Sequence, residues 1–458
     1  MVAQEMAVRD FASMPGPPRR KVLGNGLRFR QDLLGALLDD MRDYGDLVRY
    51  DILPGVKPLH VTLLAAHHPD DVRAVLTQTE RALSKQTVGI RVLTDLLGEG
   101  LLTTDGDTWR RQRRIVQPLF TRRTIDRYAE LMAEEAARLE LSPGVHELNL
   151  AMRRYTLRVV GRALFSEDID DTVAELHTLV PRVSDVAMRR TFQLFRVPLR
   201  VPTPRNLAAR RVRREEYAIV DRIIARASGS GEPAARDDLL TRLRAARDPE
   251  TGEGLSEQEI RDQILVFLMA GHETTAGALT ATLHLLGRHP EEQEAVAAEV
   301  AEVVAGRPAP LPEDLPRLVR TRAALLEGMR LYPPAYLTER ITREPVSLGH
   351  YVVPPGVMVF VAPWTTHRHP AFWPDPERFD PSRFVGEHDR PSYAYFPFGG
   401  GPRACVGEHF AVLEATILLA VVLGRYRVTA VEPDLRVEPL VTLRPVGSVP
   451  VKLESRAR

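Results

Sequence analysis

Cysteine is almost missing from this chain, since Cys405 is the only one among 458 residues. A single cysteine excludes any disulfide within the chain. Proteins without disulfides are typical of reducing compartments. Together with the missing signal peptide described below, this predicts a cytoplasmic protein.

An excess of charge of one sign is also missing. The chain has 62 basic and 61 acidic residues, which gives a formal net charge of +1, and only four of the basic residues are lysines. Proteins that bind nucleic acids usually carry a basic excess. We therefore expect no nucleic-acid partner.

Long apolar runs are missing as well. The proline-rich N-terminal segment, residues 1–20, is largely polar and contains Pro15-Gly16-Pro17-Pro18. It lacks the continuous apolar stretch of a signal peptide or a spanning helix. The most apolar helical segment, residues 264–270, is short and runs into His272 and Glu273. We therefore expect no membrane anchor.

The spacing of apolar residues predicts a mainly α protein with a small β region. Apolar residues recur every three or four positions through most of 69–306, which favours helices, and proline with β-branched residues clusters after residue 331, which favours short strands and turns. More specific predictions are a helix over 29–44, strands over 47–52 and 59–64, an exposed loop over 228–238, irregular packed chain over 363–402, and a last helix over 408–423 that ends at Gly424.

The lone cysteine lies in a glycine-rich loop, residues 398–407, directly before that last helix. A thiolate is favoured by a nearby helix N-terminus and by positive charge, and Arg403 lies two residues before Cys405. Consecutive glycines allow tight turns and a close approach of the backbone to a flat cofactor. The alternative is a buried structural cysteine, but the loop favours a single thiolate ligand.

This loop resembles the haem-binding segment of the cytochrome P450 family, F-x-x-G-x-R-x-C-x-G. Every fixed position is present, as Phe398, Gly401, Arg403, Cys405 and Gly407. The resemblance implies the P450 fold as one large haem-binding domain over residues 1–458. It also implies haem b with Cys405 as the iron ligand, and a cofactor-binding role for Phe398, Arg403 and Gly407.

A second motif, Ala270-Gly271-His272-Glu273-Thr274-Thr275, lies within a helical run over 256–288. The hydroxyl of Thr274 is placed to bond the carbonyl of Ala270, and such bonds loosen a helix, so we expect a local opening here. The segment resembles the family's A/G-G-x-D/E-T-T. That likeness implies that Glu273 and Thr274 are catalytic and deliver protons to bound dioxygen.

Further family patterns concern structure and the haem propionates. Glu327 and Arg330 match an E-x-x-R pair, and Arg383 is the expected third member of a buried frame, although Ser382 stands where the family often has glutamate. Trp109 and Arg113 match W-x-x-x-R, and together with Arg403 and Arg340 they are candidate propionate ligands. His367 and His369 are weaker candidates, which we expect to be surface residues in a turn.

The resemblance also implies separate redox partners. No flavin domain is visible, so electrons should come from NAD(P)H through ferredoxin reductase and ferredoxin to a monomeric enzyme. Arg110, Arg111 and Arg114 form either a docking site for an acidic ferredoxin or an ordinary solvated face.

The activity that the resemblance implies is a monooxygenase. Such an enzyme inserts one atom of O2 into an apolar small molecule by hydroxylation or epoxidation. The motifs are similar to those of bacterial members of secondary metabolism that tailor terpenes or polyketides. Fatty-acid hydroxylation, a peroxide-driven enzyme, and a haem sensor or electron carrier are the alternatives. Apolar residues before Glu273 (Phe267, Met269, Ala270), a loop over 86–100 and residues 335–338 are the expected substrate pocket.

Overall fold

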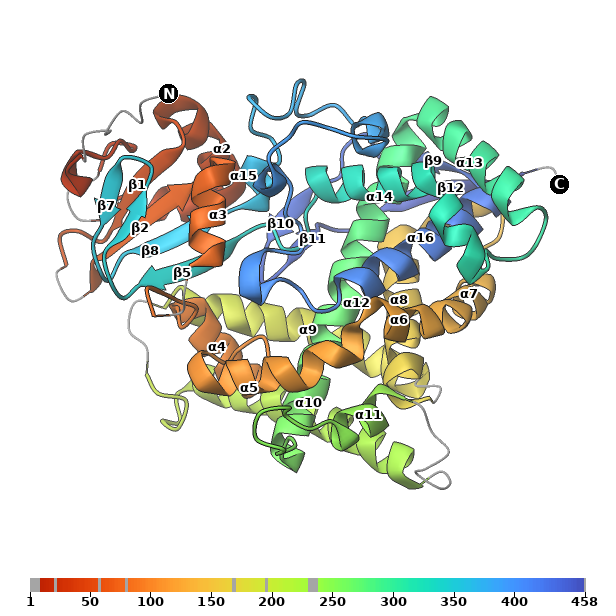
Figure 1. Cartoon of the computed structure of the whole chain (residues 1–458), viewed down its shortest axis with the longest axis horizontal. Helices are drawn as coiled ribbons and strands as arrows, with labels where there is room; N and C mark the ends of the chain where they lie inside the picture. The colour runs from red at the N-terminus through yellow and green to blue at the C-terminus, as the bar shows by residue number, and fades with distance from the viewer. Residues whose placement is uncertain are drawn as a thin grey trace. The chain divides into compact units, whose positions relative to one another are not determined.

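Helices dominate the structure, a computed structural model, as the sequence predicts (Figure 1). It describes residues 9–19, 23–56, 59–78, 81–166, 170–193, 197–229 and 238–456. The chain forms two compact units. The sheet unit contains residues 1–91, 335–378 and 389–405, and the helical unit contains residues 92–334, 379–388 and 406–458.

The sheet unit contains seven of the described strands and several short helices. Its strands are β1 (Leu47–Ile52), β2 (Val61–Ala66), β3 (Leu83–Ser84), β5 (Thr338–Thr342), β6 (Val346–Leu348), β7 (Tyr351–Val353) and β8 (Met358–Val361). Its helices are η1 (Phe11–Ser13), α1 (Gly26–Gln31), α2 (Leu33–Tyr44), α3 (Pro69–Thr77), α15 (Pro363–Thr366), η8 (Ser392–Ala394) and η9 (Gly401–Arg403). Helix α4 (Val88–Leu97) spans the boundary between the units.

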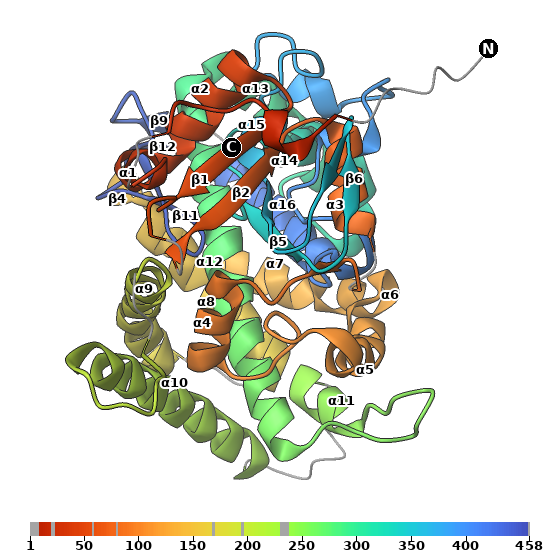
Figure 2. The same cartoon turned by 90° about the vertical axis from the view of Figure 1, so that its left-hand side faces the viewer.

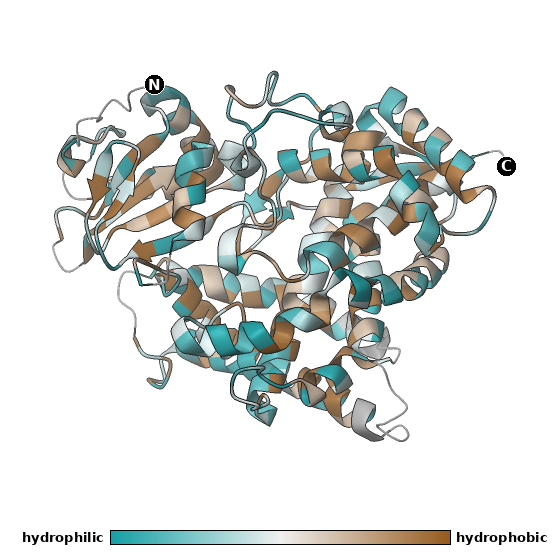
Figure 3. Cartoon of the chain, in the orientation of Figure 1, coloured by the Kyte–Doolittle hydropathy of each residue, from teal (hydrophilic) through white to brown (hydrophobic). Residues whose placement is uncertain are grey.

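Five strands form the main sheet in the order β1-β2-β8-β5-β3, in which β2 and β8 are parallel and the other pairs antiparallel. Both faces of this sheet are buried. Leu64 packs with Val72 of α3 on one face, whereas Leu63 packs with Leu37 of α2 on the other. This alternation follows from the two-residue repeat of a strand. Figure 3 accordingly colours much of the sheet as hydrophobic.

The helical unit holds the long helices. They are α5 (Gly106–Val116), α6 (Arg122–Ile125), α7 (Ala129–Ala137), α8 (Leu148–Phe165), α9 (Asp170–Thr191), α10 (Pro204–Gly229), α11 (Leu239–Ala245), α12 (Glu257–Arg288), α13 (Pro290–Val304), α14 (Val319–Leu331) and α16 (Glu408–Arg425). Short 3-10 helices are η3 (Gln117–Phe120), η4 (Asp126–Tyr128), η6 (Pro312–Arg317) and η7 (Pro381–Phe384). Strands β4 (Gly144–Glu147), β9 (Tyr426–Ala430) and β12 (Pro450–Ser455) form one small sheet, and β10 (Val437–Pro439) pairs with β11 (Leu443–Pro445).

Helix α12 runs through the core of the helical unit. It begins at a capping box, in which Ser256 and Glu259 satisfy each other's backbone N–H groups. Among the described residues it is the one helix with the length and mean hydropathy of a membrane span, and 67% of that stretch is buried. Helices α8, α14 and α16 pack against it, so the apolar surface of α12 serves as protein core.

Several predicted boundaries need correction. The predicted helix 29–44 is two helices, because the backbone of Asp32 is extended (φ −154°) and its side chain caps α2 by accepting from Gly35. The predicted loop 86–100 is mostly helix α4. Helix α16 passes through Gly424, which packs against Val300 of α13 instead of ending the helix. The strand predicted over 59–64 is β2, shifted by two residues.

Other predictions agree with the structure. Strand β1 has the predicted bounds, and α12 begins one residue after the predicted start and ends where predicted. The loop predicted over 228–238 falls largely outside the described residues.

Candidate functional site

Cys405 lies in the sheet unit at the end of its glycine-rich loop. Its backbone N–H donates to the carbonyl of Phe398 (2.9 Å), which closes the loop, and its side chain is exposed. Gly401 has φ +64°, and a Cβ there would lie 2.2 Å from the carbonyl oxygen of Leu76, so only glycine suits this turn. The loop therefore presents an accessible thiol on a backbone fixed against α3.

Two predicted propionate ligands also belong to the sheet unit. Arg340 on β5 is buried, and its guanidinium donates to the hydroxyl of Thr338 (3.2 Å) and the carbonyl of Glu339 (2.9 Å). Arg403 ends the short helix η9, two residues before the cysteine, and is partly exposed.

The expectation that His367 and His369 are surface residues is wrong. His367 is fully buried, and its Nε2 accepts from the backbone N–H of Phe396 (2.9 Å). His369 is half-buried and contacts Asp46 through its ring nitrogen (2.9 Å). Both histidines therefore hold the sheet unit together.

Thr274 lies on an accessible strip of α12. Phe267, Ala270, Gly271 and Thr274 are at least partly exposed, whereas most of the helix is buried. Their spacing places them on one helical face. Thr274 donates to the carbonyl of Ala270 (2.6 Å), as predicted, but α12 runs through this point as an uninterrupted helix, so the expected local opening is not present.

Glu273 points into the helical unit and is only 9% exposed. Burial raises the pKa of its carboxyl, and the nearby Arg153 and a hydrogen bond from Thr442 partly offset that rise. A buried carboxyl with a raised pKa keeps its proton to a higher pH than an exposed carboxyl does.

Arg153 and Thr442 are neighbours of Glu273 that the sequence did not indicate. Arg153 lies on α8. One turn later on the same helix, the hydroxyl of Thr156 donates to the carbonyl of His272 on α12 (3.0 Å), and this bond fixes how α8 lies against α12. Gly271 allows this approach, since a Cβ there would lie 3.0 Å from a methyl group of Val160. Both neighbours are more than a hundred residues from Glu273, so no local pattern marks them.

Trp109 and Arg113 both lie on α5, one turn apart, as predicted. Trp109 is buried in the core of the helical unit, and the guanidinium of Arg113 donates to Gln117 (3.0 Å). All three arginines between and beside them form ion pairs, Arg110 with Asp107, Arg111 with Glu259 and Arg114 with Asp248. Only Arg110 is exposed, so the three arginines do not form a common docking face.

The predicted structural frame is present. Glu327 and Arg330 on α14 are both fully buried and form a bidentate pair, with N–O distances of 2.7 and 2.8 Å. Arg383 in η7 lies 3.5 Å from the same carboxylate, which also accepts from the backbone N–H of Asp380. The absence of glutamate at residue 382 therefore does not disturb the trio.

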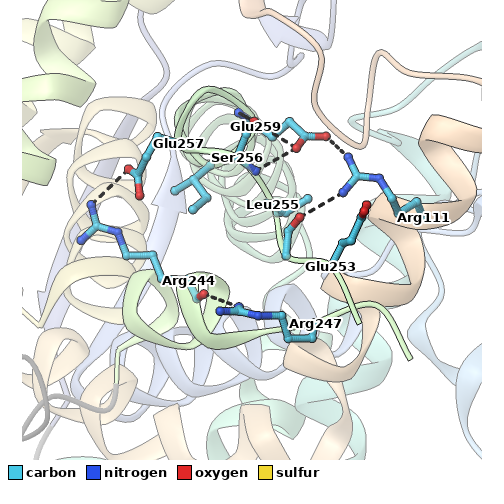
Figure 4. Close-up of a pocket in the computed structure, with 10 residues that line it drawn as sticks. Arg111, Arg244, Arg247, Glu253, Leu255, Ser256, Glu257 and Glu259 are labelled. Atoms are coloured by element: carbon cyan, nitrogen blue, oxygen red, sulfur yellow. Dashed lines mark hydrogen bonds and ion pairs between the residues drawn. The ribbon is translucent and has the colours of Figure 1, made fainter. Parts of the chain in front are cut away.

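A cavity of about 700 Å³ lies beside the first turn of α12 (Figure 4). Charged side chains line it, and two ion pairs cross its rim, Arg111 with Glu259 and Arg244 with Glu257. Ser256 precedes Glu273 by seventeen residues, which is about 25 Å along a helix. This polar cavity is therefore distinct from the apolar pocket expected near Thr274.

Comparison with known proteins agrees with these motifs. The family model described as Cytochrome P450 matches residues 14–449. The chain belongs to the cytochrome P450 family. It is 36% identical over 447 residues to cyclooctatin synthase of Streptomyces melanosporofaciens, covering 95% of this chain and 94% of the relative.

Two further relatives are similar over most of their lengths. Cyclooctat-9-en-7-ol 5-monooxygenase of the same organism is 37% identical over 419 residues (90% of this chain, 89% of the relative). Pentalenene oxygenase of Streptomyces avermitilis is 34% identical over 452 residues (95% of both chains). This P450 is thus an enzyme, a monooxygenase that uses haem iron, O2 and supplied electrons.

The residues of this P450 fit a haem. Among the described residues no group of three or more His, Cys, Asp or Glu side chains is arranged to hold a metal ion. Cys405 in contrast offers one accessible soft ligand, which is the ligand that haem iron takes in this family. The candidate residues come from both units, with Arg340, Phe398, Arg403 and Cys405 in the sheet unit and Trp109, Arg113, Glu273, Thr274 and Gly407 in the helical unit.

Proposed function

We propose that this P450 inserts one oxygen atom from O2 into a polycyclic terpene during bacterial secondary metabolism. The observation that carries the proposal is the similarity over nearly the whole chain to three Streptomyces enzymes, two of which are named for oxidising pentalenene and cyclooctat-9-en-7-ol. The partly exposed apolar residues beside Thr274 support a hydrocarbon substrate, because apolar ligands are bound mainly by burial of their surface.

Cys405 is the proposed haem ligand. Its accessible thiol and the closed loop from Phe398 to Gly407 support this role, and Arg403, Arg340, Trp109 and Arg113 are the proposed partners of the propionates. When bound, haem with a thiolate ligand supplies the O2-splitting chemistry of the family. In this proposal the loop positions the thiol of Cys405, and the four named partners would neutralise the propionates.

Thr274 and Glu273 are the proposed proton carriers. The hydroxyl of Thr274 donates its own proton to Ala270, so its oxygen remains able to accept a hydrogen bond from water. Glu273 is buried with a raised pKa, so it can hold a proton and release it. Arg153 and Thr442 orient this carboxyl, because the first supplies an opposite charge and the second a hydrogen bond.

Electrons are proposed to reach a monomeric enzyme in the cytoplasm from NAD(P)H through ferredoxin reductase and ferredoxin. Exposed arginines on α5 and α6, including Arg110, Arg122 and Arg123, support an acidic partner. Arg111 and Arg114 are left out of this docking site because most of each side chain is covered, whereas Arg110 is half exposed although it pairs with Asp107.

The haem ligand is tested by absorption spectroscopy of the reduced protein with carbon monoxide. The protein should show the red-shifted band of thiolate-ligated haem that gives the family its name. Cys405→Ala should lose that band completely. A band at shorter wavelength in the unaltered protein, as a histidine ligand gives, would contradict the role of Cys405.

The substrate class is tested by titration with a small library of polycyclic terpenes, polyketide macrolactones and fatty acids, while the haem spin state is followed. Terpenes should give the largest shift at the lowest concentration, and the best one should be oxidised with NADPH, ferredoxin and ferredoxin reductase. Turnover with hydrogen peroxide alone would indicate the peroxide-driven alternative. Tight binding of fatty acids alone would reject the terpene proposal.

A further inference from the structure

A buried carboxylate, that of Asp262, lies on α12 about three turns before Thr274. Its residue is only 4% exposed. One carboxylate oxygen accepts from the hydroxyl of Tyr217 (2.6 Å) and from the side-chain amide of Gln258 (2.7 Å), and the other accepts from the backbone N–H of Glu99 (2.7 Å). Within the described chain no arginine or lysine pairs with it. Three neutral donors therefore hold this carboxylate, and a buried charge depends on such bonds.

The three donors come from different parts of the helical unit. Tyr217 lies on α10, Gln258 on the first turn of α12, and Glu99 in the chain between α4 and α5. We call this chain, residues 98–105, the α4–α5 connection. Helix α10 packs against both α9 and α12 (Figure 2). Asp262 is therefore the point at which α10 and the α4–α5 connection are both bonded to α12.

The start of the α4–α5 connection has a backbone that suits this contact. Gly98 has φ +80°, and a Cβ there would lie 2.4 Å from both the carboxyl carbon of Asp262 and the hydroxyl of Tyr217. Gly100 lies against the next turn of α12, where a Cβ would be 2.8 Å from a methyl group of Val266. Glycine at these two positions allows the backbone to lie directly on α12.

Two buried glutamines hold the same connection. The amide oxygen of Gln263, which follows Asp262 on α12, accepts from the backbone N–H of Leu101 (3.1 Å). The side-chain amide of Gln112 on α5 donates to the carbonyl of Glu99 (2.9 Å). Both glutamines are fully buried. The connection is therefore bonded to α5 and α12, and α10 reaches it through Asp262.

The α4–α5 connection borders the accessible strip of α12. Leu101 belongs to the same buried apolar cluster as Val266, and Phe267 packs against that cluster. Phe267 begins the strip that leads to Thr274, and Val266 precedes Thr274 by eight residues, about 12 Å along the helix. A shift of the connection would therefore change the apolar surface at this end of the strip.

We propose that Asp262 is a positioning residue for the oxidation, because its bonds to Tyr217 and Glu99 fix the α4–α5 connection as one wall of the substrate pocket. Asp262 acts through the connection and not on the reacting atoms, so it determines which ligands fit. A carboxylate suits this role, since it has only acceptors and can receive all three donors at once. The inference does not depend on the terpene proposal, and its test needs no substrate.

The proposal is tested with two haem ligands of different size. Imidazole is small, whereas clotrimazole is an imidazole with three aromatic rings that must pack against the pocket wall. Titration of the haem-loaded enzyme, followed by the shift of the haem absorption band, gives both dissociation constants. Asp262→Ala frees the connection, so clotrimazole should bind about tenfold more weakly, which is part of what burial of an aromatic ring supplies. The affinity for imidazole should stay the same.

Three further variants separate positioning from a general loss of stability. Asp262→Asn should restore the affinity for clotrimazole, because its oxygen can accept from Glu99 and its NH2 group can donate to Tyr217, while the exposed glutamine amide reverses. Tyr217→Phe removes only the bond to α10 and should have a smaller effect than Asp262→Ala. The control Asp221→Ala removes the bidentate pair of Asp221 with Arg261 (both bonds 2.7 Å), which also joins α10 to α12. It should leave the ratio of the two affinities unchanged.

Hydrogen exchange gives a second readout that needs no haem ligand. The amide of Glu99 should lose its protection in Asp262→Ala and keep it in Asp221→Ala. If Asp262→Ala does not fold, Gly98→Ala replaces it. That variant keeps every bonding group but pushes the connection away from α12, so it should weaken clotrimazole and spare imidazole in the same way.

Two results would overturn the proposal. The first is an Asp262→Ala enzyme whose affinities for clotrimazole and imidazole are both unchanged or both reduced equally, because the pocket wall would then not depend on Asp262. The second is an equal loss of clotrimazole affinity in Asp221→Ala, because a general loosening of α10 would then explain the effect.

Discussion

The hydroxyl of Thr274 has one proton, and the carbonyl of Ala270 already accepts it at 2.6 Å. The oxygen of this hydroxyl can still accept a hydrogen bond from a water molecule on the accessible strip of α12. The neighbouring carboxyl of Glu273 is turned into the helical unit. The two side chains of this pair therefore face different surroundings, one accessible and one buried among Arg153 and Thr442.

Replacement of Thr274 should separate oxygen activation from product formation. Thr274→Ala removes the hydroxyl that is proposed to hold water, so electrons should be diverted to hydrogen peroxide, and product per NADPH should fall about tenfold or more. The measurement is peroxide and product per NADPH consumed. Thr274→Ser keeps the hydroxyl and is the matched control, with most of the coupling retained. Full coupling in Thr274→Ala would contradict the proposed proton transfer.

Helix α14 shows how a buried ion pair fixes an element. Glu327 accepts from Arg330 on its own helix and from the backbone N–H of Asp380, and it forms an ion pair with Arg383 in η7, so one carboxylate joins two segments about fifty residues apart in sequence. The spacing of Glu327 and Arg330 was sufficient to predict the pair. Their burial could be argued only from apolar neighbours.

Loss of one member of this frame should be far more costly than loss of an exposed pair. Glu327→Gln leaves the buried guanidinium of Arg330 uncompensated, which should lower the free energy of unfolding by about 3–5 kcal/mol. The exposed pair of Asp39 and Arg42 has the same i,i+3 spacing, and Asp39→Asn should cost less than about 1 kcal/mol. Urea unfolding compares the two. Equal costs would show that the buried pair is not a structural frame.

Element boundaries show where sequence reasoning succeeded and where it failed. Ser256 starts α12 through a capping box that can be read locally, and the α12 prediction was accurate. Asp32 also caps a helix, but the apolar repeat continues across it, so two helices were predicted as one. The prediction that the last helix ends at Gly424 was wrong for a different reason. This glycine allows close packing against Val300, which lies on a distant helix.

At the scale of the whole molecule, the family motifs were enough to predict a mainly α protein and its enzyme class, because each motif is a short run of neighbouring residues whose spacing can be read directly from the sequence. What the sequence did not supply were contacts between distant segments. His367 is the example, since its burial depends on a bond from Phe396, twenty-nine residues later. Arg153 beside Glu273 is another.

The stability of the whole molecule should depend on one buried acid, Glu414 of α16. Its side chain is fully buried, neither carboxyl oxygen has a hydrogen-bond partner among the described residues, and burial raises its pKa well above the usual range. In the unfolded chain this carboxyl ionises near its ordinary pKa. The unfolded state therefore loses its proton first, and stability falls as pH rises through the interval between the two pKa values.

Glu414→Gln should remove this dependence. Relative to the unaltered enzyme, the variant should gain free energy of unfolding as pH rises above the ordinary glutamate range, by up to about 1.4 kcal/mol per pH unit. The measurement is urea unfolding at a series of pH values. Glu432→Gln, at an exposed position, should give a parallel pH profile without such a gain. If the free energies of unfolding of Glu414→Gln and the unaltered enzyme differ by the same amount at every pH, the carboxyl is not buried in its neutral form.

The order of strands in the main sheet has a consequence for synthesis on the ribosome. Strand β2 pairs with β8, and β8 pairs with β5, yet β2 ends at Ala66 and β5 begins at Thr338. At 5–20 residues per second, β1 and β2 emerge tens of seconds before their partners exist. During that interval the edge of β2 that later pairs with β8 has unpaired backbone N–H and C=O groups, which can pair with another chain. A nascent chain stalled before Thr338 should therefore recruit a chaperone. A chain stalled after Val361 should not.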